Sequence, residues 1–97
     1  MAYRLKLREG ARKDLFQAFG WYERQKPGLG TELISEIEAA FALLIKTPEA
    51  FPKKKKHLRE YNLKIFPYVI IYMIQKNEVI VFAIFHTHLN PNKKPSA

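Results

Sequence analysis

Cations and histidines in the second half of the chain are the residue types best suited to chemistry. Residues 53–97 hold nine Lys and Arg against two Asp and Glu, whereas residues 1–52 hold eight against seven. Histidine can titrate near neutral pH, and arginine can bind a phosphate through two N–H groups. Cleavage of RNA by its own 2′-hydroxyl needs an acid, a base and cations that stabilise the phosphorane, and it needs no metal. The candidate catalytic residues are therefore Arg59, Lys64, His86 and His88.

A run of four lysines followed by a histidine has two interpretations. Such a run is most often a solvated loop. It can also meet a polyanion, because each lysine that neutralises a phosphate releases a counterion. The net charge of +8, concentrated in the second half, favours a nucleic acid, a ribosome-like surface or an acidic protein as partner. The candidate nucleic-acid-binding residues are Lys53, Lys54, Lys55, Lys56 and His57.

Other kinds of site find little support in the sequence. The chain has no cysteine, which excludes disulfides and cysteine-ligated zinc. His86 and His88 would share one side of a continued strand, but no third ligand stands at a recognisable spacing, so we expect no metal site. The serine-hydrolase, P-loop, dinucleotide-binding and H-E-x-x-H patterns are absent, and we expect no cofactor.

Length and hydropathy indicate the kind of protein that carries these residues. The chain has 97 residues, of which 47% are hydrophobic, and this favours one globular domain over residues 1–97. The N-terminal sequence MAYRLKLREG alternates charged and apolar residues and does not resemble a signal peptide. No segment approaches the roughly 18 apolar residues that cross a bilayer. We expect a small cytoplasmic protein without a membrane partner.

The spacing of apolar residues predicts the elements that must position the candidate residues. Strict alternation predicts a strand over residues 3–8. Helical spacing follows over 11–25 and 33–46, and three further strands are predicted over 58–66, 68–75 and 78–86. This β, α, α, β, β, β order favours an α+β fold, in which a helical hairpin packs on a small, mostly antiparallel, four-stranded sheet. The last strand is apolar on both faces and is expected to lie inside the sheet.

Two positions conflict with this simple pattern. Arg59 shares the register of Tyr61, Leu63 and Ile65, so it must either precede the strand or lean out of a packed face. Phe16 and Trp21 lie off the apolar stripe of the first helix. These two aromatic residues either pack beneath the strands or the C-terminal tail, or they form a partner-binding surface for a helix or strand of another protein or for a second copy.

Four segments in order resemble the RelE/ParE superfamily of toxins. They are WYERQKPGLG at 21–30, TPEAFP at 47–52, KIFPYVIIY at 64–72 and VIVFAIFHTHLNP at 79–91. The resemblance covers nearly the whole chain, and it implies a growth-inhibiting, plasmid-stabilisation toxin of a type II toxin–antitoxin system. It further implies a cognate antitoxin encoded nearby, with which the toxin forms a hetero-oligomer. RelE-like members cut mRNA in the ribosomal A site, whereas ParE-like members poison DNA gyrase and have no recognised nuclease site.

The resemblance also assigns positions to the candidate residues. Arg59 and Lys64 match basic positions ahead of the FPY segment, and His86 matches the histidine that closes the last strand. Many relatives carry H-x-x-R-x-P here, but this chain has Leu89 in place of the arginine. The lysine run would meet a polyanionic target, or would attract an acidic antitoxin. The sequence slightly favours an endoribonuclease over a gyrase inhibitor, with a basic nucleic-acid-binding adaptor as the third alternative.

Overall fold

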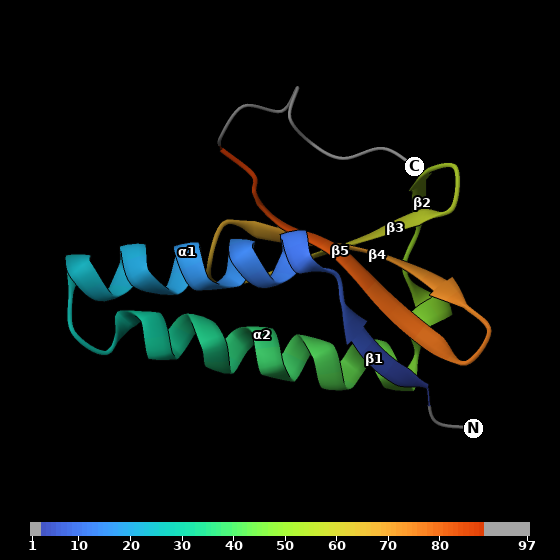
Figure 1. Cartoon of the computed structure of the whole chain (residues 1–97), viewed down its shortest axis with the longest axis horizontal. Helices are drawn as coiled ribbons and strands as arrows, with labels where there is room; N and C mark the ends of the chain where they lie inside the picture. Colours follow the sequence, from blue (N-terminus) through green and yellow to red (C-terminus); the bar gives the residue numbers. More distant parts are fainter. Residues whose placement is uncertain (1–2, 89–97) are drawn as a thin grey trace.

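The structure, a computed structural model, describes residues 3–88 of the chain. Figure 1 shows two antiparallel helices lying beside a twisted sheet. The elements in chain order are β1 (Arg4–Leu7), α1 (Glu9–Gln25), α2 (Leu29–Lys46), the 3-10 turn η1 (Pro48–Ala50), β2 (Lys53–Lys55), β3 (Leu58–Asn62), β4 (Tyr68–Gln75) and β5 (Glu78–His86). Neither helix of the described chain is long and apolar enough to cross a membrane.

The sheet confirms the predicted α+β class and adds one strand to it. The strand order is β1-β5-β4-β3-β2, with β1 parallel to β5 and all other neighbours antiparallel. The predicted four strands are present, and β5 lies inside the sheet as expected. The fifth strand is β2, which forms because the lysine run pairs with β3, Lys53 opposite Arg59. Part of the run is therefore an edge strand, where lysine side chains discourage pairing with another chain.

The main core lies between the helices and one face of the sheet. Its largest fully buried side chains come from α2, β4 and β5, and they include Leu33, Ile37, Leu44, Ile70, Tyr72, Val79 and Val81. A smaller apolar cluster occupies the other face of the sheet and contains Leu58, Val69, Ile71 and Ala83. Both faces of β4 and β5 are thus apolar, which explains why these strands read as continuous hydrophobic runs.

The turn between the helices is held by Glu23. Its Oε1 accepts hydrogen bonds from the backbone N–H groups of Gly28 at 2.9 Å, Gly30 at 2.8 Å and Thr31 at 3.4 Å. These include donors at the start of α2 that have no partner within the helix. A Cβ on Gly30 would lie 2.7 Å from the backbone oxygen of Phe19, so the close approach of the two helices requires glycine. The second helix begins at Leu29, four residues before the predicted start at 33. Its first turn is stabilised by these hydrogen bonds to Glu23, which the apolar spacing could not indicate.

A second carboxylate corrects the predicted extent of β3. Glu36 of α2 accepts the backbone N–H groups of Lys64 at 2.7 Å, Ile65 at 3.0 Å and Phe66 at 3.1 Å. These donors are therefore unavailable to a strand, and β3 ends at Asn62 and not at residue 66. Ile65, predicted to share a face with Tyr61, is 79% exposed at this turn. Burial raises the pKa of Glu36, but the three N–H bonds outweigh it, and the pKa is lowered overall.

Candidate functional site

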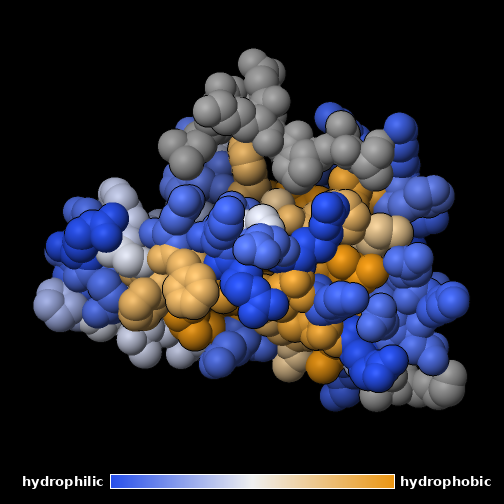
Figure 2. All heavy atoms as spheres, in the orientation of Figure 1, coloured by the Kyte–Doolittle hydropathy of each residue, from blue (hydrophilic) through white to orange (hydrophobic). Residues whose placement is uncertain are grey.

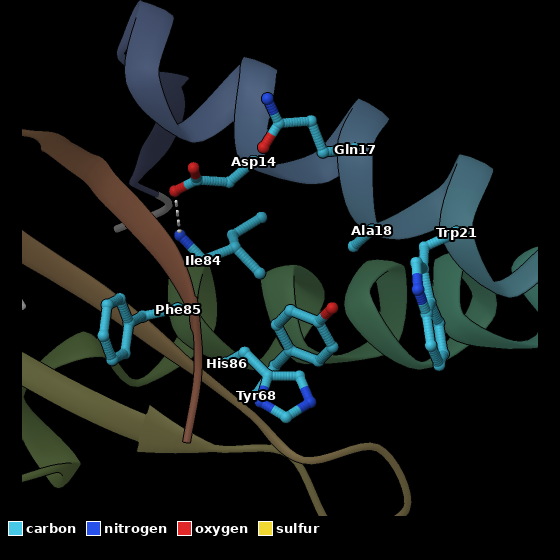
Figure 3. A pocket seen from close by; sticks show the side chains of 8 residues that line it. All are labelled: Asp14, Gln17, Ala18, Trp21, Tyr68, Ile84, Phe85 and His86. Carbon is cyan, nitrogen blue, oxygen red and sulfur yellow. Dashed lines mark hydrogen bonds between the residues drawn. The ribbon is translucent and has the colours of Figure 1, made fainter. Parts of the chain in front are cut away.

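An open pocket of about 510 Å³ lies between α1 and the ends of β4 and β5, shown in Figure 3. Side chains from α1 form one wall, and those from the sheet form the other. The lining residues are Asp14, Gln17, Ala18, Trp21, Tyr68, Ile84, Phe85 and His86. The volume falls in the range of roughly 300–1,000 Å³ that is usual for ligand clefts.

Among the described residues that line this pocket, Asp14 supplies the one carboxylate. Strand β1 pairs with β5 only as far as Val81, so the following stretch of β5 has no strand on that side. The Asp14 carboxylate takes the place of a neighbouring strand as acceptor, and its Oδ2 accepts a hydrogen bond from the backbone N–H of Ile84 at 3.0 Å. Burial raises the pKa of Asp14, and this hydrogen bond only partly opposes the shift. The bond uses one carboxylate oxygen and leaves the other for a further donor.

Aromatic rings form the rest of the pocket's recognition surface. The rings of Tyr68 and His86 meet edge to face, with centroids 5.0 Å apart. Tyr22 links Trp21 to Tyr68 beneath the surface, at 4.9 Å and 6.2 Å. Burial, together with nearby Tyr22 and Asp14, raises the pKa of Tyr68 to about 12, so its hydroxyl is neutral near pH 7. Trp21 is 50% exposed and turns a ring face toward the pocket (Figure 3).

The two histidines at the end of β5 contact each other. The backbone N–H of His88 donates to Nδ1 of His86 at 3.1 Å, and the two ring centroids are 5.7 Å apart. Burial and the neighbouring His88 lower the pKa of His86, which favours the neutral ring at pH 7. With Nδ1 accepting, the proton of that neutral ring lies on Nε2. In this arrangement His86 offers a donor to the pocket and not a free base.

A smaller pocket of about 240 Å³ lies at the lysine-rich end of the sheet. It is lined by Glu49, Lys53, His57, Arg59 and Ile74. Figure 2 shows hydrophilic side chains covering the end of the molecule at which β2 lies. Arg59 belongs to β3, so it does not precede the strand; it is half-buried and lies opposite the buried Tyr72 of β4.

The guanidinium of Arg59 makes hydrogen bonds that stabilise the fold. Its Nη1 donates to the backbone oxygen of Phe51 at 2.6 Å and to that of Glu49 at 3.3 Å. The Tyr72 hydroxyl donates to the backbone oxygen of Pro48 at 2.6 Å. These bonds tie η1 and the following segment to the sheet, so part of the hydrogen-bonding capacity of Arg59 is already taken.

The structure brings together only some of the predicted catalytic residues. Arg59 pairs with Tyr72 and His86 pairs with Tyr68, so the two lie on opposite sides of β4 and four residues apart along it. At about 3.4 Å per residue and 4.8 Å per strand, their Cα atoms are on the order of 17 Å apart. Lys64 lies in the exposed turn held by Glu36. His86 and His88 are neighbours, whereas Arg59 is remote from them.

The aromatic residues predicted to bind a partner are both at the surface. Phe16 is 71% exposed and Trp21 is 50% exposed, so neither packs beneath the strands. Only Trp21 lines the larger pocket. Sequence reasoning missed Asp14 and Tyr68 as site residues. Asp14, Ala18 and Trp21 stand at i, i+4 and i+7, and this spacing on one helix face could have indicated a shared wall.

The lysine run and His57 are exposed, and Lys56 turns the chain with a φ of 49°. Leu89, which stands where many relatives carry arginine, lies outside the described residues. Within residues 3–88, no group of three or more His, Asp or Glu side chains could hold a metal ion.

Comparison with known proteins gives the family to which this fold and site belong. The sequence matches the model of the "ParE toxin of type II toxin-antitoxin system, parDE" over residues 5–91. It is 30% identical over 93 residues to Toxin ParE2 of Mycobacterium tuberculosis, covering 95% of this chain and 89% of that one. The chain therefore belongs to the ParE toxin family, within the RelE/ParE superfamily of type II toxin–antitoxin toxins.

Solved structures show the same fold at low sequence identity. The chromosomal ParDE system of P. aeruginosa matches with a TM-score of 0.80 and 16% identity, over 90% of this chain and 98% of that one. The isolated E. coli RelE toxin matches with a TM-score of 0.68 and 18% identity, over 94% of this chain and 90% of that one. At such identities the likeness speaks for the fold alone, which is common to both branches of the superfamily.

Proposed function

We propose that this toxin inhibits growth by binding DNA gyrase, as the ParE-like branch does, and not by cutting mRNA. The observation that carries the proposal is the placement of Arg59. A nuclease needs its cations beside its acid and base, because they must stabilise charge on one phosphate. Arg59 instead donates to the main chain near η1, and the strand register separates it from His86.

The state of His86 supports the same conclusion. Metal-independent RNA cleavage needs a group that accepts a proton from the 2′-hydroxyl. A neutral His86 whose Nδ1 accepts from His88 has no free lone pair for that step. The preference for mRNA cleavage suggested by the sequence therefore gives way to its alternative, a non-enzymatic inhibitor.

We also propose that the chain is neutralised by a cognate antitoxin, with which it forms a hetero-oligomer. The similar P. aeruginosa protein is described as part of a ParDE toxin–antitoxin system. The exposed aromatic side chains of Phe16 and Trp21 give such a partner an apolar surface to cover.

The test adds the purified protein to a gyrase supercoiling reaction and, separately, to a bacterial translation extract. Gyrase inhibition with intact mRNA is the expected result. Truncated mRNA with normal supercoiling would overturn the proposal and restore the nuclease. Growth arrest on expression, without an effect in either reaction, would also overturn gyrase as the target.

A further inference from the structure

The composition of the larger pocket runs against that of the whole chain. The protein has 17 Lys and Arg against nine Asp and Glu, yet none of the Lys and Arg within residues 3–88 lines this pocket. Among the described lining residues, the charged group is the carboxylate of Asp14, and the aromatic residues are Trp21, Tyr68, Phe85 and His86. A carboxylate beside aromatic faces is a combination that recognises organic cations, through charge-assisted hydrogen bonds and cation–π contact.

We propose that this pocket binds an arginine side chain presented by the antitoxin. The identity of the partner rests on the proposed function, whereas the chemistry of the pocket rests on its own residues. Arginine suits the site better than lysine, because a planar guanidinium can stack on a ring while it donates two N–H groups to a carboxylate.

The contacts of the pocket residues define how the arginine would bind. Asp14 uses Oδ2 for the N–H of Ile84 and has a second oxygen for a guanidinium N–H. The ring of Trp21 is half exposed and contacts Tyr22 edge to face, and it supplies a face for stacking. The Tyr68 hydroxyl is neutral near pH 7 and can accept a further N–H. His86, whose pKa is lowered, adds no positive charge that would repel the ligand.

Other occupants of the pocket are less well matched. An apolar side chain would cover Asp14 without supplying a charge partner, and burying an unpaired carboxylate is costly. An acidic side chain would be repelled by the same group. Arginine both covers the rings and pairs with the carboxylate, so charge complementarity selects it.

The experiment titrates the full-length protein with N-acetyl-arginine amide and with its neutral isostere, N-acetyl-citrulline amide. Trp21 is the single tryptophan of the chain, so its fluorescence and its indole N–H signal in NMR report directly on the pocket. We expect saturable binding of the arginine probe, at least roughly tenfold tighter than that of the citrulline probe, because charged hydrogen bonds are lost in the isostere.

Two variants and one control isolate the site. Asp14→Asn keeps an oxygen for the N–H of Ile84 but removes the charge, so the preference for arginine should disappear. Trp21→Leu should weaken arginine binding, followed through the ring signals of His86. Gln25→Ala lies exposed on the same helix and outside the lining of the pocket, so binding should be unchanged. Equal affinity for both probes, or an unchanged preference in Asp14→Asn, would overturn the arginine site.

A second measurement tests the source of the arginine. Each arginine of the short protein encoded beside this one is changed to glutamine, and its affinity for wild-type and Asp14→Asn toxin is measured. We expect one arginine whose loss weakens binding to the wild type by tenfold or more and has little effect on the variant. No such coupling would overturn the antitoxin as donor. The same probe titration is repeated with the toxin variant Lys93→Gln/Lys94→Gln. Tighter binding of the arginine probe to this variant would assign the pocket to the chain's own lysines, and would also overturn the antitoxin as the source of the cation. Neither result depends on gyrase, so this inference and the proposed target can fail separately.

Discussion

The two ends of the sheet carry pockets of opposite chemistry. Beside α1, a pocket of about 510 Å³ is lined by Asp14 and four aromatic residues, and by none of the described lysines or arginines. Beside β2, a pocket of about 240 Å³ is lined by Lys53, His57 and Arg59 together with Glu49 and Ile74. The net charge of +8 for the chain matches the chemistry of the pocket beside β2 but not that of the pocket beside α1. A basic protein of this size can therefore hold one surface for an anionic partner and a separate one for a cationic side chain.

The two ends also differ in how much of their chemistry the fold has already used. At the β2 end, Arg59 bonds to main-chain oxygens, while the lysines of the run remain exposed. At the α1 end, Asp14 bonds to Ile84 with one oxygen. Arg59, one of the four candidate catalytic residues of the sequence, is thus a structural anchor, whereas the Asp14 carboxylate keeps one oxygen for a further donor.

The largest expected effect comes from breaking the helical hairpin at the α1 end. Gly30→Ala places a Cβ 2.7 Å from the backbone oxygen of Phe19 and 2.7 Å from Cγ of Glu23. We expect a loss of about 1–3 kcal/mol in the free energy of unfolding, because overpacking forces the helices apart. Urea unfolding followed by Trp21 fluorescence measures it.

The matched control is Gly20→Ala on the neighbouring helix. Its Cβ would meet only the flexible Arg24 side chain, at 3.3 Å, and alanine is the better helix former by up to about 1 kcal/mol. Stability should stay equal or rise. If Gly30→Ala proved as stable as this control, the close-packed hairpin would not be what positions α1.

A smaller effect should follow from breaking the anchor at the β2 end. Arg59→Ala leaves the backbone oxygens of Phe51 and Glu49 without this donor, at a cost of about 1–3 kcal/mol, reduced by water access to the half-buried site. Lys53→Ala, exposed and directly opposite Arg59, should stay within about 0.5 kcal/mol of the wild type. Thermal melting of both variants measures the difference. An unchanged melting temperature for Arg59→Ala would return this residue to the list of purely functional cations.

The smallest effect on stability, and the sharpest separation of the two ends, should come from the lysine run. Changing Lys53, Lys54, Lys55 and Lys56 to glutamine should reduce the slope of log affinity for DNA against log salt by at most roughly 3 to 4. Trp21→Ala, at the other end, should leave the slope unchanged. Binding isotherms at several salt concentrations give the result. A slope that the glutamines do not alter would mean that the lysines only protect the sheet edge and keep the run solvated.

Local sequence patterns determined most of the architecture. The order of elements follows from period-two and helical spacing, and β4 and β5 lie at the predicted residues. Parity within β3 also marked Arg59 as a charged residue in the register of an apolar face, and its guanidinium there bonds to main-chain oxygens. The resemblance to RelE/ParE toxins, carried by segments spread along the chain, indicated the family that the comparisons show. These features depend on neighbours close in sequence or on segment order, so a single chain reveals them.

Contacts between distant residues decided what the sequence left open. The bond from Ile84 to Asp14 joins residues 70 positions apart, and those from Glu36 join α2 to a turn 28 to 30 positions later. No local pattern marks a helix carboxylate that will meet a backbone N–H of another element. The strand register that separates Arg59 from His86, and the pairing that makes β2 a strand, likewise require the assembled sheet. Hydrogen-bond partners are chosen by packing in three dimensions, because every buried N–H must find an acceptor wherever the fold brings one near.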